Sequence, residues 1–155
     1  NEWHYKCSER KPDFLIQKLV DGVPITVDVI THGSQVQFAA RYRKLVVGSQ
    51  SIVMAPCNDD SVLTVLADII GTIDLLGIWN FQVIKSGDHF YLHDINPRPS
   101  SGLFFSIARG LKAFEYIAHL SVDGLKEPFT LDGVIRDDLE MCIYQEYELR
   151  RVAEL

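Results

Sequence analysis

The residues best suited to chemistry lie between positions 80 and 98, where amide, carboxylate and guanidinium side chains recur along the sequence. Two runs of alternating apolar residues flank Ser86-Gly87-Asp88, and this pattern predicts a β-hairpin. Successive side chains of a strand point to opposite faces. One face of the hairpin is therefore expected to carry four polar side chains: Asn80, Gln82, Asp94 and Asn96.

The polar face of this predicted hairpin offers oxygen ligands, with a basic residue just beyond it. Carboxylate and amide oxygens suit hard cations such as Mg²⁺, which often combine one or two carboxylates with substrate phosphates. Arg98 follows the second strand, and its planar guanidinium suits a phosphate or a carboxylate. The same residues also fit a solvent-facing polar strand closed by a turn at Asn96-Pro97, so both interpretations stay open.

A turn centred on Gly87 would fix which residues face each other across the hairpin. Gln82 is then expected opposite Leu92, and Asn80 opposite Asp94. Strict alternation also predicts that the apolar residues at even positions of the second strand share the face of Asp94.

The hairpin resembles the late motif of the ATP-grasp family, especially its carbamoyl-phosphate-synthase-like members. The matching residues are Asn80-Phe81-Gln82 and Tyr91-Leu92-His93-Asp94-Ile95-Asn96-Pro97-Arg98. The family usually ends the second strand with Glu-x-Asn-x-Arg, and Asp94 here is one methylene shorter than that Glu. The resemblance implies that Gln82, Asp94 and Asn96 hold Mg²⁺ (or Mn²⁺) against the phosphates of ATP. It also implies that Arg98 steadies an acyl phosphate or the group that attacks it.

Upstream of the hairpin, apolar runs at 14–20, 25–30 and 35–43 predict an antiparallel meander. The resemblance makes Gln17-Lys18-Leu19-Val20 a hinge that contacts adenine, with Gln17 in place of the usual acid. A solvated charge at the end of a strand is an equally good interpretation of Lys18.

Two arginines share the polar face of the third predicted strand. Arg41 and Arg43 are expected near Asp28 if the preceding turn centres between His32 and Gly33. Two guanidinium groups on one face suit a triphosphate or an acyl phosphate, so Arg41 is a candidate nucleotide contact and Arg43 a candidate catalytic residue. The alternative is a weakly stabilising surface ion pair with Asp28.

The remaining elements complete an α+β fold. Asn58 is a candidate N-cap for an amphipathic helix over 58–76, with Gly77 at its C-terminal end. Shorter helices are expected at 103–110 and 111–120, and a closing strand around 140–147. We expect an antiparallel sheet of about six or seven strands with helices packed on one face. Residues 1–12 are interpreted as an N-terminal arm and 13–155 as a single domain like the C-terminal half of an ATP-grasp domain, a fragment of a longer protein.

Composition narrows the class of protein. The formal net charge of −6 argues against a nucleic-acid footprint, and no apolar run approaches the length of a membrane helix. Three widely spaced cysteines indicate reduced thiols and a cytoplasmic location. Three histidines could suggest zinc, but their spacing lacks a second ligand pair: His32, His89 and His93.

By resemblance, the parent protein is a ligase that uses Mg-ATP to activate a carboxylate or bicarbonate as an acyl phosphate, which an amine or similar nucleophile then displaces. Two alternatives remain: a non-catalytic nucleotide-binding domain that lacks the lid, and a structural or oligomerising module. The expected partners are ATP, the carboxylate substrate, and either a second copy or the missing N-terminal half.

Overall fold

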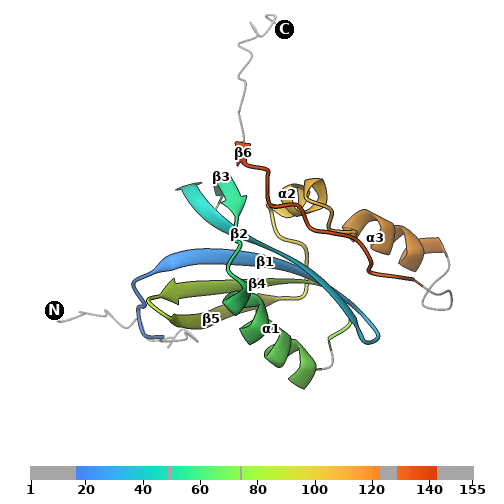
Figure 1. Ribbon diagram of the computed structural model, residues 1–155, viewed down its shortest axis with the longest axis horizontal. Helices are drawn as coiled ribbons and strands as arrows, with labels where there is room; N and C mark the ends of the chain where they lie inside the picture. Colours follow the sequence, from blue (N-terminus) through green and yellow to red (C-terminus); the bar gives the residue numbers. More distant parts are fainter. Residues whose placement is uncertain (1–16, 49, 74, 123–128, 143–155) are drawn as a thin grey trace, which may run out of the picture.

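The core of the protein is a six-stranded antiparallel sheet in the order β5-β4-β1-β2-β3-β6 (Figure 1). The computed structural model describes residues 17–48, 50–73, 75–122 and 129–142. The strands are β1 (Val23–His32), β2 (Gln35–Val47), β3 (Gln50–Pro56), β4 (Gly77–Ser86), β5 (His89–Asn96) and β6 (Met141–Cys142). Every residue of β1 from Ile25 to Thr31 is buried, because this strand lies inside the sheet and both of its faces are covered.

The three helices cover opposite faces of the sheet, so the α+β class is confirmed but the expectation of helices on one face is wrong. Helix α1 (Asp60–Thr72) lies on one side, and α2 (Leu103–Ala108) and α3 (Ala113–Val122) lie on the other (Figure 1). Side chains at odd positions of β1, such as Val27, pack with Leu66 of α1. Ile30 points the other way and packs with Tyr116 of α3. The cause is that both faces of β1 are buried, including the face that carries the polar residues Thr26 and Asp28.

The β4–β5 hairpin turns at Gly87 as expected, but its register differs from the prediction. Val83 pairs with Leu92, whereas the next residue, Gln82, pairs with Asp94, so His93 forms a β-bulge. Asn80 therefore faces Asn96 rather than Asp94. Because of this extra residue, the even-numbered side chains of β5 lie on one face of the sheet before the bulge and on the other face after it.

This bulge separates the apolar and polar residues of β5. Phe90, Leu92 and Ile95 all pack on the face covered by α1. Asp94 and Asn96 lie on the opposite face with their partners from β4. The predicted polar face is thus present, whereas the prediction that Leu92 shares it is wrong.

Helix α1 is shorter than expected at both ends. Its N-cap is Asp59, not Asn58: the Asp59 carboxylate accepts a hydrogen bond from the Ser61 backbone N–H at 3.1 Å. Ile73 leaves the helix in an extended conformation, and Gly77 is the first residue of β4 rather than the helix C-cap. A second contact holds the cap, because Asp59 also forms an ion pair with Lys85 of β4.

Asp59→Ala is expected to lower the free energy of unfolding by about 1 kcal/mol at neutral pH, the usual effect of losing an N-cap. Lys85 and the Ser61 hydroxyl hold the pKa of Asp59 below its ordinary value of 3.8. A lowered pKa means that the carboxylate stabilises the fold above that ordinary value and loses its effect as the pH falls through the folded-state pKa. The difference from wild type should therefore shrink in acid, as urea unfolding at several pH values would reveal. Asn58→Ala is the control, and an equal loss there would contradict the assignment.

Some of the remaining predictions concern residues that the structure describes, and others concern residues outside those ranges. Residues 17–20 are not in a strand, which contradicts a strand over 14–20 for its described part. The two short helices occur as α2 and α3, and the closing strand is present at 141–142, where it pairs with β3. The expected arm at 1–12 and the continuation of the closing strand past 142 lie outside the described residues. Within the described ranges, the helices are too short or too polar to span a bilayer.

Candidate functional site

A cleft of about 460 Å³ opens on the sheet face that α2 and α3 partly cover. Its walls come from β1, β2, β3, β4, the β2–β3 turn and the loop after β5. The lining residues are Thr26, Arg41, Arg43, Val46, Gly48, Ser51, Asn80, Gln82, Arg98, Ser100 and Ser101. Three of them are arginines and none is acidic, so the cleft suits an anionic ligand.

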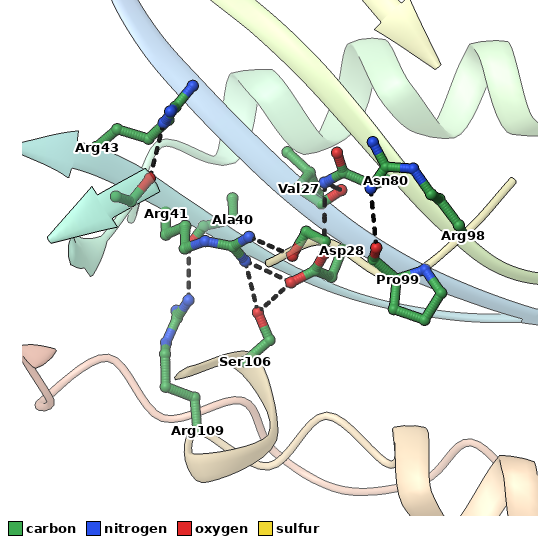
Figure 2. Close-up of polar contacts among 12 residues, drawn as sticks. Val27, Asp28, Ala40, Arg41, Arg43, Asn80, Arg98, Pro99, Ser106 and Arg109 are labelled. Atoms are coloured by element: carbon green, nitrogen blue, oxygen red, sulfur yellow. Dashed lines mark hydrogen bonds and ion pairs between the residues drawn. The ribbon is translucent and has the colours of Figure 1, made fainter. Parts of the chain in front are cut away.

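A buried polar network centred on Arg41 forms the floor of the cleft (Figure 2). Arg41 is only 2% exposed and forms an ion pair with Asp28, which is fully buried. The same guanidinium donates to Ser106 of α2 at 2.8 Å and to Ser100 at 2.6 Å, and Ser106 donates to Asp28 at 2.7 Å. Asn80 of β4 donates to the other Asp28 oxygen at 3.4 Å. The expected closeness of Arg41 and Asp28 is therefore correct, but the pair is buried rather than on the surface.

The loop after β5 packs directly on this guanidinium. A Cβ at Gly102 would lie 2.9 Å from both Nε and Nη2 of Arg41, and 2.9 Å from the Met54 sulfur. Glycine is required here because only a bare backbone can approach so closely. Arg41 thus links the strand β2 to the start of α2.

The other two arginines lie at the rim. Arg43 is half-buried, and its Nε donates to Ser51 of β3 at 2.8 Å. Arg98 is exposed, and its Nη1 donates to the Pro99 carbonyl at 3.2 Å. Figure 2 shows both arginines on either side of the Arg41–Asp28 pair. The two candidate catalytic residues are therefore brought to one cleft.

The three candidate metal ligands meet on the β4–β5 hairpin. Gln82 donates to Asp94 Oδ2 at 3.3 Å, and Asn96 donates to the same oxygen at 2.7 Å. Gln82 also lines the cleft, so it connects Asp94 and Asn96 to the arginines.

The Gln82–Asp94–Asn96 set fits Mg²⁺ only if a bound anion supplies further oxygen ligands. One carboxylate and two amides are hard oxygen ligands of the kind that Mg²⁺ accepts together with substrate phosphates. Within the described ranges, no group of three or more His, Cys, Asp and Glu side chains is arranged to hold a metal ion. A cation at the hairpin would therefore need ligand oxygens from an anion in the cleft.

The predicted adenine hinge is not part of this cleft. None of the residues 17–20 lines it, and Leu19 is 93% exposed.

Sequence reasoning also missed several lining residues, among them Thr26. The signal was available, because Thr26 is at an even position of β1 and pairs with both Arg41 and Gln82.

Comparison with known proteins identifies the family. One family model matches residues 10–136, which is most of the chain. The chain therefore belongs to the ATP-grasp proteins, in the family described as ATP-grasp in the biosynthetic pathway with Ter operon. No curated protein matches the chain.

Solved structures share the fold at low sequence identity. N5-carboxyaminoimidazole synthetase from Staphylococcus aureus is 19% identical with a TM-score of 0.53, covering 68% of this chain and 30% of that one. Its complex with ADP gives the same TM-score and identity, covering 68% and 31%. A single-chain, multi-domain long-chain acyl-CoA carboxylase is 18% identical with a TM-score of 0.52, covering 77% and 14%. The chain thus spans less than a third of the length of each of these proteins.

Proposed function

We propose that the cleft binds the phosphates of ATP together with Mg²⁺, as part of a ligase that activates a carboxylate or bicarbonate as an acyl phosphate for an amine or similar nucleophile. The observation that carries this proposal is the meeting of three arginines with the Gln82–Asp94–Asn96 group in one cleft. Membership of an ATP-grasp family supports the choice of nucleotide.

The arginines divide into a fixed one and two that reach the ligand. Asp28 neutralises Arg41, so Arg41 shapes the floor and contributes little net charge. Arg43 and Arg98 lie at the rim and would contact the phosphoryl oxygens, where a guanidinium binds in a bidentate manner. The cleft volume lies within the range of small-molecule sites.

Asp94, Gln82 and Asn96 would hold the cation. Bound Mg²⁺ would supply neutralisation of phosphate charge, which together with positioning accounts for most of the catalysis in phosphoryl transfer. The residues 17–20 stay a prediction for the adenine contact. Because the chain spans less than a third of the related structures, nucleotide binding without turnover is the alternative for this segment alone.

Asp94→Asn is expected to weaken Mg-ATP binding by about 10-fold or more, the usual effect of losing a contact to a charged group. It should leave the weaker binding of metal-free ATP nearly unchanged, since the carboxylate acts through the cation. Calorimetric titration of both proteins with ATP, with and without Mg²⁺, would measure this. Asp88→Asn is the matched control, because Asp88 is an exposed carboxylate at the turn of the same hairpin.

Two results would contradict the proposal. One is that the wild-type chain binds no ATP at millimolar concentration with Mg²⁺ present. The other is that Asp94→Asn and Asp88→Asn bind Mg-ATP equally well.

A further inference from the structure

The exposed side of α2 and α3 carries a patch of large apolar side chains. We call it the outer patch, and it consists of Phe104 of α2 and Phe114, Ile117 and Leu120 of α3. Their exposed fractions are 67%, 52%, 42% and 39%, respectively. The rings of Phe104 and Phe114 meet edge to face with centroids 6.0 Å apart, so the two neighbouring helices share one apolar surface (Figure 1). None of these four residues lines the cleft, so the outer patch is separate from the proposed nucleotide site.

Helix α3 buries two of its polar side chains and exposes its large apolar ones, the reverse of a helix that borders water. Tyr116 is fully buried and His119 is 9% exposed, whereas Phe114 and Ile117 face solvent. Glu115 is the only Asp, Glu, Lys or Arg in the sequence of this helix. An exposed apolar face with so little charge is typical of a surface that another protein surface covers.

The exposed residues of α3 have the spacing of a helix–helix contact. One stripe, at positions i, i+3, i+4 and i+7, consists of Phe114, Ile117, Ala118 and Ser121. A second α3 can pack antiparallel on this stripe about a two-fold axis midway between positions 117 and 118. Phe114 then faces Ser121 of the partner subunit, and Ile117 faces Ala118 of the partner subunit. Each large side chain therefore meets a small one, as close helix packing requires, whereas a parallel pair would set large against large.

The size of the outer patch also fits one half of a dimer. Its exposed fractions leave roughly 350–400 Å² of apolar surface, since a fully exposed aromatic side chain presents about 200 Å² and an aliphatic one somewhat less. Interfaces are about 60% apolar, so a contact centred on this patch would bury roughly 600 Å² per copy, or about 1,200 Å² in total. That total exceeds the roughly 1,000 Å² expected of a specific interface.

We propose that the outer patch binds a second copy of this chain, with the two α3 helices antiparallel about a two-fold axis between positions 117 and 118. The stripe selects a second copy because the same four residues supply both the large and the small side chains of the contact, as an isologous interface requires. Glu115 lies beside the stripe, one residue after Phe114, so the dimer keeps this carboxylate at the rim of the contact.

Sedimentation velocity of the chain tests this proposal, and a dimer should form at concentrations of about 10–100 µM. Ile117→Glu should weaken dimerisation by at least about 10-fold, because it places a charge at the centre of the patch. Ile73→Glu is the matched control and should leave the dimer unchanged. Ile73 is 43% exposed, nearly the same as Ile117, but it ends α1 on the opposite face of the sheet (Figure 1). A wild-type chain that stays monomeric at these concentrations, or equal effects of the two variants, would overturn the proposal.

Cysteine cross-linking tests the antiparallel orientation with a substitution that keeps the helix intact. Ala118→Cys places a thiol beside the two-fold axis, so mild oxidation with diamide should join two copies through the introduced thiols. Ala67→Cys is the control, because Ala67 is an exposed alanine on α1, and the wild-type chain gives the background from its three native cysteines. Cross-linking of Ala118→Cys no greater than that of Ala67→Cys would contradict the two-fold arrangement. Neither experiment measures ATP binding, so the dimer is tested separately from the proposed function.

Discussion

Arg41→Met should lower the free energy of unfolding by about 3–5 kcal/mol, because it leaves Asp28 as a buried charge without its cation. Asp28 is fully buried, and its remaining partners would be the neutral Ser106 and Asn80. Hydrogen bonds from neutral groups stabilise a carboxylate less than a guanidinium does. Urea unfolding of the two proteins would measure the difference.

Lys44→Met is the matched control for this substitution. Lys44 is on the same strand and also pairs with an acid, Glu140, but both side chains are about half exposed. Such surface pairs contribute about 0–1 kcal/mol. Equal losses of unfolding free energy for Arg41→Met and Lys44→Met would show that the buried pair stabilises the fold no more than the exposed pair does.

The double variant Asp28→Leu/Arg41→Met separates charge from packing. Replacing both members of a buried pair with apolar side chains of similar size is often neutral or stabilising. We expect the double variant to recover most of the stability lost in Arg41→Met. A loss in the double variant as large as in the single one would instead indicate that Ser100 and Ser106 need the guanidinium as a donor.

The local pattern predicted much of the hairpin and little of its register. Alternation in 80–96 and a turn at Gly87 were sufficient for two paired strands with amides and a carboxylate on one face. The bulge at His93 could not be predicted, because it depends on which apolar residues α1 covers. One inserted residue moves Leu92 to the α1 face and places Asp94 opposite Gln82 instead of Asn80.

The burial of the Arg41–Asp28 pair also could not be predicted from the local sequence. The two residues are on neighbouring strands, so their closeness followed from strand pairing. What buries them is Ser106, 78 positions after Asp28, together with the close approach of Gly102. The sequence pattern of a polar strand face does not reveal whether water or a helix covers that face. The one-face expectation for the helices was wrong for this reason.

Arg109→Met should cost roughly 2–5 kcal/mol, because it removes the donors for at least two buried or half-buried carbonyl groups. Arg109 is 1% exposed and donates to the Ala40 carbonyl of β2 and to the Arg136 carbonyl, each at 2.6 Å. It also forms an ion pair with Asp137, and its guanidinium lies over Phe105. This one side chain thus joins α2, β2 and the segment after α3, as Figure 2 shows for Ala40.

The segment 129–140 has no helix or strand of its own, so its position depends on such contacts. Chemical unfolding would measure the loss of stability in Arg109→Met, and limited proteolysis should reveal new cleavage within this segment. Arg136→Met is the control, because the Arg136 side chain is exposed and forms an ion pair with exposed Asp138. Arg109→Lys should fall between the two, since lysine keeps the charge but loses the planar fork that reaches several acceptors. Proteolysis of Arg109→Met at the rate of Arg136→Met would contradict this role for Arg109.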